Sequence, residues 1–297
     1  MSHYDFTQNR DTIFSETACV LSHTPFDGKQ WILRLAAPLC ASKATAGSFV
    51  HLQCDPMRPL RRPISIMQTN PSEGWIELLY KVVGEGTELL SHKQVGDALE
   101  MLGPIGKGFI THPDKPRTLL IGGGVGLPPM IFIAQQLKND AQWKPFCILG
   151  SEVPFPFSTP LTDQRISGIP IEVSATMPLL QEWGIANRLA SLQNYIGCFQ
   201  GYVTDLARRW LQALSEQERQ EVEIFSCGPT PMLAAVAKLA KEFGLPCQVS
   251  LEEYMACAVG GCAGCVVRIE TETGASMQRV CVDGPVFDSA TVPMLHR

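Results

Sequence analysis

The sequence predicts a multidomain β + α/β chain, in which an antiparallel β-barrel precedes a doubly wound parallel sheet and a small cysteine-rich module. Three observations lead to this fold class. Short apolar or alternating segments fill the first hundred or so residues, strands alternate with helical stretches from about residue 118, and four cysteines crowd between 257 and 281. With 297 residues, the chain is long enough for two or three compact units.

The barrel is expected from strands near residues 30–36, 48–54, 63–67 and 75–83. Turn residues such as Asp27-Gly28 separate these strands, which is the pattern of an all-β barrel or sandwich. This part should end near residue 113.

The second unit begins with the apolar strand Leu119–Ile121, and a glycine run and a helix from Pro128 follow it. A strand that leads into a helix in this way is typical of a doubly wound parallel sheet. Further strands are expected at 146–149, 169–173 and 222–226, and further helices at 206–214 and 231–243. The unit should end near Leu251.

The third unit carries four cysteines with a characteristic spacing. Cys257, Cys262 and Cys265 share one loop, and Cys281 follows after a longer interval, as in plant-type [2Fe–2S] proteins. Alanines and glycines between them let the backbone approach a cluster closely. Zinc also binds four thiolates, but structural zinc sites favour two short Cys pairs. A [2Fe–2S] cluster is therefore the favoured ligand, with zinc and unliganded thiols as the alternatives.

Two segments could bind phosphate groups, although each has a simpler explanation. Gly122, Gly123, Gly124 and Gly126 lie between a buried strand and a helix, where a backbone can cradle a pyrophosphate or merely turn tightly. The segment 61–65 supplies two arginines and a serine, which could pair with a diphosphate or be a solvated barrel edge.

Overall composition limits the partners and the compartment. The formal net charge of −5 lacks the basic balance of a nucleic-acid binder. No basic segment followed by an apolar run opens the chain, and no segment approaches the length of a membrane span. Eleven cysteines, with four of them crowded together, favour a reducing compartment and a local metal site. We therefore expect a cytoplasmic protein.

At this point the chain resembles a known family. It is similar to the ferredoxin–NADP reductase superfamily and, within it, to the electron-transfer subunits of NAD-linked (class 1B) dihydroorotate dehydrogenase. The segments that carry the likeness are Arg62-Pro63-Ile64-Ser65, Val83-Gly84-Glu85-Gly86-Thr87, Leu102-Gly103-Pro104-Ile105-Gly106, Cys227-Gly228-Pro229, and the stretches 250–257 and 281–287.

The resemblance implies roles for particular residues. It divides the chain into an FAD-binding barrel (1–113), an NAD-binding α/β domain (114–251) and a [2Fe–2S] module (252–297). The residues implied to hold FAD are Arg62, Pro63, Ile64, Ser65, Leu79, Tyr80, Lys81, Gly86 and Thr87. Those implied for the nicotinamide nucleotide are Gly122, Gly123, Gly124, Gly126, Cys227, Gly228 and Pro229, and the cluster ligands are Cys257, Cys262, Cys265 and Cys281.

The resemblance also implies a partner. In that family an FMN-containing subunit oxidises dihydroorotate, the cluster carries electrons singly, and FAD passes a hydride to NAD. We therefore expect a hetero-oligomer in which this chain alone does not oxidise dihydroorotate. Alternatives are a related subunit of a hydrogenase, sulfite reductase or transhydrogenase, and a non-catalytic redox-sensing subunit.

Two further expectations concern less typical segments. The loops 150–157 and 174–178 depart from the arginine- and acid-bearing loop and the Thr-Asp-Asp-Gly-like stretch that relatives carry beside the adenosine half of NAD, which questions the nicotinamide specificity. Glu252-Glu253 precede the cysteine loop and are expected to be a solvated strand end or a contact to the partner.

Overall fold

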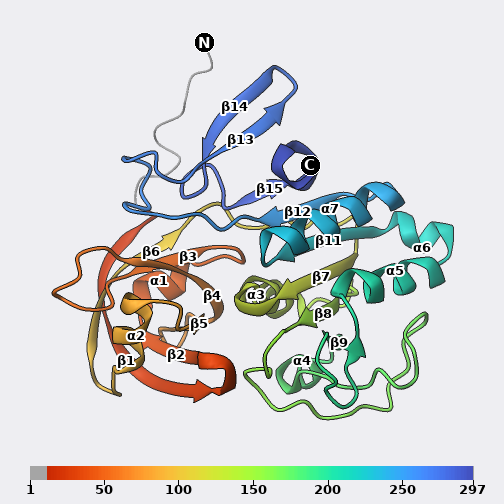
Figure 1. Cartoon of the computed structure of the whole chain (residues 1–297), viewed down its shortest axis with the longest axis horizontal. Helices are drawn as coiled ribbons and strands as arrows, with labels where there is room; N and C mark the ends of the chain where they lie inside the picture. Colours follow the sequence, from red (N-terminus) through yellow and green to blue (C-terminus); the bar gives the residue numbers. More distant parts are fainter. Residues whose placement is uncertain (1–11, 297) are drawn as a thin grey trace.

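The computed structural model describes residues 12–296, and its first unit is a closed antiparallel barrel (Figure 1). The strand order around the barrel is β1-β2-β5-β4-β3-β6. The strands are β1 (Phe14–Phe26), β2 (Gln30–Ala36), β3 (Phe49–Leu52), β4 (Arg62–Asn70), β5 (Trp75–Lys81) and β6 (Ala98–Ile105). Two short helices, α1 (Pro38–Lys43) and α2 (Glu85–Ser91), join them. The expected barrel is confirmed.

Apolar side chains that alternate along the strands fill the barrel interior. Leu33 and Leu35 of β2 face Leu78 and Ile76 of β5, and all four are fully buried. This period-two pattern is what a half-buried strand requires. The long strands β1 and β6 were not expected, because the polar residues in Phe14–Phe26 weaken the apolar alternation.

The second unit is a seven-stranded sheet in the order β10-β9-β8-β7-β11-β12-β15, parallel except for its last strand. Its strands are β7 (Arg117–Gly123), β8 (Phe146–Gly150), β9 (Ala186–Ser191), β10 (Phe199–Gln200), β11 (Val222–Cys227), β12 (Cys247–Ser250) and β15 (Val286–Asp288). Its helices are α3 (Leu127–Leu137), α4 (Pro178–Glu182), α5 (Val203–Ala213), α6 (Glu216–Gln220) and α7 (Thr230–Phe243). The doubly wound sheet is confirmed.

Helices cover both faces of this sheet. Helix α3 packs between β7 and barrel strand β4, so it also joins the two units. Helices α5 and α7 pack on the opposite face, where Leu206, Leu233 and Val236 belong to a second hydrophobic core. Parallel strands therefore have both faces buried, as such sheets require.

One expected strand is wrong. Residues 169–173 form turns, and the strand beside β8 is instead Ala186–Ser191. Gly168 has a φ of +77°, and Pro170 has no backbone N–H, so both residues disfavour a central strand at this position.

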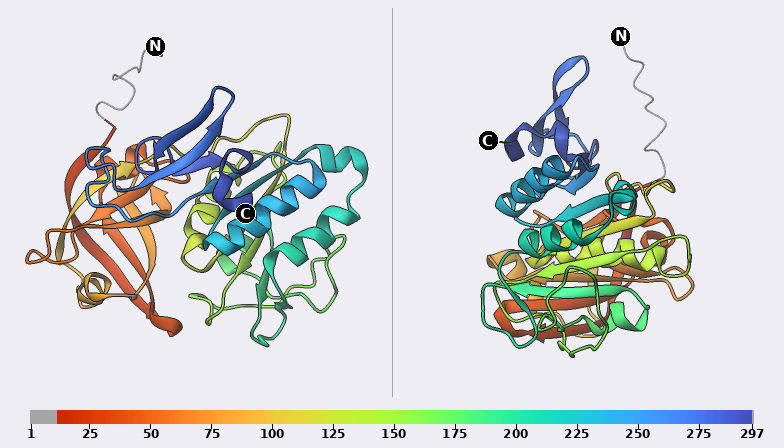
Figure 2. Two further views of the ribbon diagram at one scale, coloured as in Figure 1. Left: turned by 45° about the horizontal axis from the view of Figure 1, so that its top comes forward. Right: turned by 90° about the vertical axis from the view of Figure 1, so that its right-hand side faces the viewer.

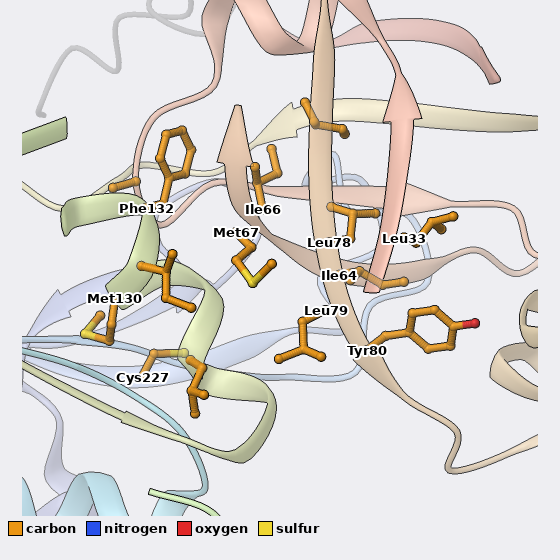
Figure 3. Close-up of a cluster of buried hydrophobic side chains, with 14 of the residues drawn as sticks. Leu33, Ile64, Ile66, Met67, Leu78, Leu79, Tyr80, Met130, Phe132 and Cys227 are labelled. Atoms are coloured by element: carbon orange, nitrogen blue, oxygen red, sulfur yellow. The ribbon is translucent and has the colours of Figure 1, made fainter. Parts of the chain in front are cut away.

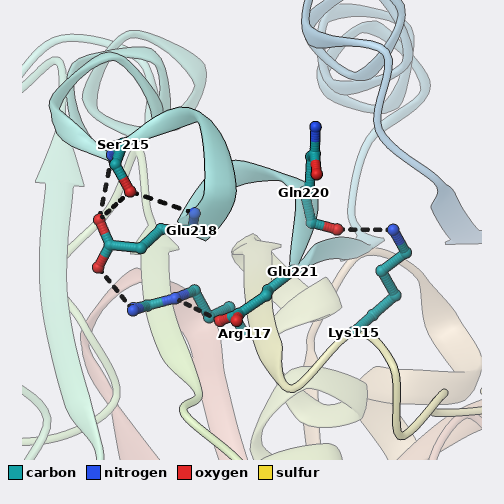
Figure 4. Close-up of polar contacts among 6 residues, drawn as sticks. All are labelled: Lys115, Arg117, Ser215, Glu218, Gln220 and Glu221. Carbon is teal, nitrogen blue, oxygen red and sulfur yellow. Dashed lines mark hydrogen bonds and ion pairs between the residues drawn. The ribbon is translucent and has the colours of Figure 1, made fainter.

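Ion pairs connect the beginning of strand β7 to helix α6 and the residue that follows it. Arg117 at the beginning of β7 donates to Glu218 at 2.6 Å and to Glu221 at 3.2 Å (Figure 4). Ser215 caps α6 by accepting from the Glu218 N–H, and the Glu218 carboxylate accepts in return from Ser215. This reciprocal arrangement is a capping box.

The C-terminal residues form a small module above the junction of the other two units (Figure 2). Its hairpin consists of β13 (Val266–Thr271) and β14 (Gly274–Arg279), and β15 then returns to pair with β12. Val267, Ile269 and Val280 share a hydrophobic core with helix α7 of the sheet. The cysteine-bearing loop is therefore anchored at both of its ends.

Candidate cofactor cavity and cysteine loop

A cavity of about 950 Å³ lies where the barrel, the sheet and the C-terminal module meet. Eight of the nine residues expected to hold a flavin line it: Arg62, Pro63, Ile64, Ser65, Leu79, Tyr80, Lys81 and Thr87. The ninth, Gly86, lies directly behind Arg62. Strands β4 and β5 are neighbours in the barrel, so two segments separated in sequence form one wall.

Arginines at this wall are arranged to receive an anion. A Cβ atom on Gly86 would lie only 2.8 Å from the Arg62 guanidinium, so the absence of a side chain at Gly86 lets the guanidinium lie directly against the start of α2. The Nε of Arg61 is buried and has no hydrogen-bond partner among the described residues, although Arg61 lines the cavity. Unpartnered buried donors are rare, and a diphosphate would satisfy this one.

Tyr80 is held in place by a histidine. His23 lies between the Lys93 carbonyl oxygen and the Tyr80 hydroxyl, at 2.9 Å from each. Burial lowers the pKa of His23, so a neutral ring donates to Lys93 and accepts from Tyr80. Burial also raises the pKa of Tyr80, which keeps its hydroxyl protonated.

The opposite wall of the cavity consists of the segment that leads into the cysteine loop. Ser250 through Ala256 line it, together with Gly264, which lies between two of the cysteines. Glu252 is exposed and follows the end of β12, as expected for a solvated strand end, and Glu252 and Glu253 also line the cavity. Sequence reasoning missed this wall because it depends on how β12 and β15 bring the segment back to the barrel.

The glycines and Cys227 meet at the carboxyl edge of the sheet. The strand order reverses between β7 and β11, and Gly122 is paired with Cys227 there. Open parallel sheets bind ligands at this kind of switch point. A Cβ on Gly126 would lie 2.3 Å from the Cys227 carbonyl oxygen, so the two loops touch.

None of the seven residues expected on the nicotinamide side lines the large cavity, although their neighbour Val125 does. Figure 3 shows Cys227 beside Met130 on the sheet side, with Leu79 and Tyr80 across from them on β5. Burial, and after it the nearby Glu252 carboxylate, raises the pKa of the Cys227 thiol. The thiol is therefore neutral at the boundary between the two units.

The four cysteines of the C-terminal module lie close together. The Cys262 N–H donates to the Cys257 sulfur at 3.4 Å, and the Gly264 N–H donates to the Cys262 sulfur at 3.4 Å. Cys265 and Cys281 are adjacent and buried, and the Val280 N–H donates to the Cys265 carbonyl oxygen at 2.9 Å. The spacing in the sequence thus becomes one compact group.

The loop conformation fits a thiolate-bound cluster. Gly260, Ala258 and Ala263 have positive φ angles, which small residues tolerate best. Desolvation opposes ionisation of Cys257, but backbone N–H groups of Cys262, Val259 and Gly261 outweigh it and lower its pKa to about 7. Desolvation, which is the larger cause, and the neighbouring Cys265 together raise the pKa of Cys281 to about 12.

Within residues 12–296, no three His, Cys, Asp or Glu side chains converge on a point that could hold one metal ion. A two-iron cluster does not need such a point, because its four thiolates are shared between two irons. The sulfur donor set and the inward N–H groups match that ligand.

A second cavity, of about 540 Å³, lies beside the segments that follow strands β8 and β9. The loops after β8 and β9 line it with Pro154, Phe155, Phe157, Thr159, Leu161, Asn194, Tyr195 and Ile196. Residues 194–196 follow β9, the strand beside β8, whereas 174–178 precede that strand.

Comparison with known proteins gives consistent matches. A domain family described as the iron–sulfur cluster binding domain of dihydroorotate dehydrogenase B matches residues 252–293. The electron transfer subunit of dihydroorotate dehydrogenase B (NAD(+)) from Desulforamulus reducens is 32% identical over 266 residues, which cover 87% of this chain and 90% of that protein. The same subunit from Caldanaerobacter subterraneus is 36% identical over 246 residues, covering 82% and 85%.

Among solved structures, an NADH-dependent reduced ferredoxin–NADP oxidoreductase, studied for flavin-based electron bifurcation, matches with a TM-score of 0.76 at 24% identity. The match covers 96% of this chain and 93% of that one. Phthalate dioxygenase reductase matches with a TM-score of 0.56 at 13% identity, over 89% and 76% of the two chains. These likenesses concern the fold.

The barrel, the sheet with its switch point and the cysteine module together define a flavin- and iron–sulfur-dependent reductase. The sequence relatives identify one family within this class of reductases. The chain belongs to the family of electron transfer subunits of dihydroorotate dehydrogenase B (NAD(+)), and the resemblance seen in the sequence is confirmed.

Proposed function

We propose that this chain is the electron-transfer subunit of an NAD-dependent dihydroorotate dehydrogenase of pyrimidine biosynthesis. It passes electrons between a catalytic, FMN-containing partner subunit and NAD through a [2Fe–2S] cluster and FAD. The family membership supports this function. One structural observation carries it: a single cavity is lined on one side by the barrel and on the other by the segment leading into the cysteine loop.

The proposed residue roles follow this geometry. Arg61, Arg62 and Thr87 bind the FAD diphosphate, and Ser65, Leu79, Tyr80 and Lys81 contact the remainder of FAD. Cys257, Cys262, Cys265 and Cys281 ligate the cluster. The glycines 122–126 and the segment Cys227–Pro229 receive the nicotinamide end of NAD at the switch point.

The chemistry divides between the cofactors and the chain. When bound, FAD couples the one-electron cluster to the two-electron carrier NAD. The residues of this chain bind and orient: His23 fixes the Tyr80 hydroxyl, and the apolar side chains of Phe49, Leu60 and Leu79 restrict water in the cavity. Gly264 lines the cavity and lies between two cluster ligands, so the path between the two cofactors is short.

We also place the protein in the cytoplasm and retain the division at residues 113 and 251. All eleven cysteines lie within the described residues and are free, which suits a reducing compartment. In the part of the chain that the structure describes, no helix is long and apolar enough to cross a membrane.

The test is an anaerobic NADH titration of the purified chain after its FAD, iron and sulfide content has been measured. We expect NADH to bleach the flavin and to produce the electron spin resonance signal of a reduced [2Fe–2S] cluster. Adding the partner dehydrogenase should then give dihydroorotate-dependent NAD reduction, which this chain alone should lack. A chain that holds both cofactors but is not reduced by NADH would instead support a redox-sensing subunit.

A further inference from the structure

Helix α3 connects the part of the chain proposed to receive NAD with the part proposed to hold FAD. The helix begins at Leu127, directly after the glycine turn, and packs against barrel strand β4. Strand β4 begins with Arg62–Ser65, which line the large cavity. Gly124–Gly126 pack against β5, whose residues Leu79–Lys81 line the same cavity. The position of α3 therefore determines where the glycine turn lies relative to the flavin wall.

Apolar side chains make up most of the contact between α3 and the barrel. Met67 of β4 belongs to the same hydrophobic cluster as Met130 and Phe132 of α3 (Figure 3). Apolar contacts are non-directional, and methionine side chains adapt readily to a new surface. Packed helices can slide by small amounts over such a surface. This packing therefore holds α3 against the barrel without fixing where it lies along β4.

Gln135 supplies a directional contact between the helix and the strand. The Thr69 N–H donates to Gln135 Oε1 at 3.1 Å, and Gln135 Nε2 donates to the Thr69 carbonyl oxygen at 2.8 Å. Thr69 is buried, and Gln135 is half-buried. Because one amide group makes two hydrogen bonds to the main chain of one residue, both the distance and the orientation between α3 and β4 are fixed at this point.

The contact lies where β4 has lost its neighbouring strand on one side. Strand β3 pairs with Arg62–Ser65, and Thr69 lies beyond that pairing, so the Gln135 amide takes the place of a neighbouring peptide group. Satisfying these main-chain groups is a structural role. A further consequence follows because an α-helix is stiff. Gln135 lies eight residues after Leu127, about 12 Å along the axis, so sliding at Gln135 would also displace the glycine turn.

We infer that Gln135 is a positioning residue for hydride transfer between the nicotinamide and FAD. The inference rests on the proposed function. In the transfer NADH + FAD → NAD+ + FADH−, a C–H bond of the nicotinamide breaks and an N–H bond forms on the flavin, so the two rings must be in contact. A misplacement of about 1 Å can slow such a step by about 100-fold. Gln135 does not line the large cavity and acts through the position of the glycine turn.

Gln135→Met tests this role, because methionine keeps the length and the apolar contact of the side chain but makes neither hydrogen bond. In stopped-flow measurements, the limiting rate of flavin bleaching at saturating NADH should fall about tenfold, while the NADH concentration that gives half of this rate should stay within about threefold. Reoxidation of the photoreduced flavin by excess cytochrome c through the cluster should stay within about twofold, because it requires no nicotinamide.

Two further variants complete the comparison. Gln136→Met makes the same change at the next residue of the helix, which is exposed, and should behave as the unmodified chain. Gln135→Glu places a carboxylate oxygen against the Thr69 carbonyl oxygen and should slow bleaching at least as much as Gln135→Met. Loss of FAD from both Gln135 variants, equal slowing of bleaching and reoxidation, or equal slowing in Gln136→Met would overturn the inference in favour of a structural role.

A second readout does not depend on turnover. Tetrahydro-NADH, a reduced nicotinamide analogue that cannot transfer hydride, should give a long-wavelength charge-transfer absorption band when its ring stacks on the oxidised flavin. The band should be present in the unmodified chain and in Gln136→Met, and weakened or shifted in Gln135→Met. An unchanged band in Gln135→Met, or no band in the unmodified chain, contradicts the inference. Failure of NADH to bleach the unmodified chain while the analogue still gives the band contradicts the proposed function instead.

Discussion

The large cavity and the smaller one differ in the groups that face them. Arg61, Arg62 and Lys81 line the large cavity, whereas among the described residues that line the smaller one none carries a charge. Charged donors are needed to bind a diphosphate, while a flat aromatic ring needs only apolar and aromatic contacts. The two cavities therefore suit different parts of nucleotide ligands, and the predictions below test that difference.

The largest effect is expected at the cysteine loop, which borders the charged cavity. Cys262→Ser should abolish the [2Fe–2S] spectrum and reduce cytochrome c reduction by NADH by about 1000-fold or more, because serine is a poor ligand for iron in such a cluster. FAD should remain bound, since Cys262 does not line the cavity.

The control for that variant is Cys19→Ser, an exposed cysteine on β1 far in sequence from the loop. Visible absorbance and iron analysis measure the outcome. A full cluster in Cys262→Ser would remove that residue from the ligand set.

The next effect concerns the arginines. Arg62→Ala should weaken FAD binding by roughly 10- to 100-fold, because a charge-assisted hydrogen bond contributes about 1.5–3 kcal/mol. Fluorescence titration of the FAD-depleted chain measures this change. Arg58→Ala is the matched control, since Arg58 pairs with Glu85 outside the cavity wall. Equal losses in both variants would argue against a specific contact.

The uncharged cavity predicts a preference between dinucleotides. We expect the adenosine half of NAD to lie in the smaller cavity, beside the loop 150–157. Because no described residue that lines this cavity is positively charged, nothing there would pair with a 2′-phosphate, and NADPH should reduce the flavin with a kcat/KM about tenfold or more below that of NADH. Phe155→Ala should weaken NADH binding by a few-fold through lost contact area. Stopped-flow measurement at several concentrations distinguishes the two effects, and a preference for NADPH would place the adenosine half elsewhere.

The smallest effect is on stability. Desolvation raises the pKa of the Glu252 carboxyl in the folded chain, so the protonated carboxyl favours folding. This contribution to the free energy of unfolding is fully present below the pKa of the unfolded chain and is lost as the pH rises through the pKa of the folded chain. Glu252→Gln should therefore be more stable than the unmodified FAD-free chain above the folded pKa, by about 1 kcal/mol or less because the group is solvent-accessible. The difference should vanish at acidic pH, and urea unfolding at several pH values measures it.

Prediction from sequence succeeded where contacts are local. The cysteine loop is compact because its ligands and its small residues are consecutive, and Arg62–Ser65 reach the cavity because one strand carries them. Sequence-based prediction failed over residues 169–198. The apolar segment 169–173 has the composition of a strand, but Pro170 has no backbone N–H to donate to a neighbouring strand. Only pairing with β8 shows that Ala186–Ser191 takes that position.

The sequence by itself determined the cofactor chemistry, since thiolate spacing and strand-borne arginines are properties of short segments. The tertiary structure decided which segments share the cavity. It placed the segment from Ser250 to Ala256 on the cavity wall opposite the barrel, through the pairing of β12 with β11 and β15. Which segments line one cavity depends on pairing between distant parts of the chain, which no local pattern records.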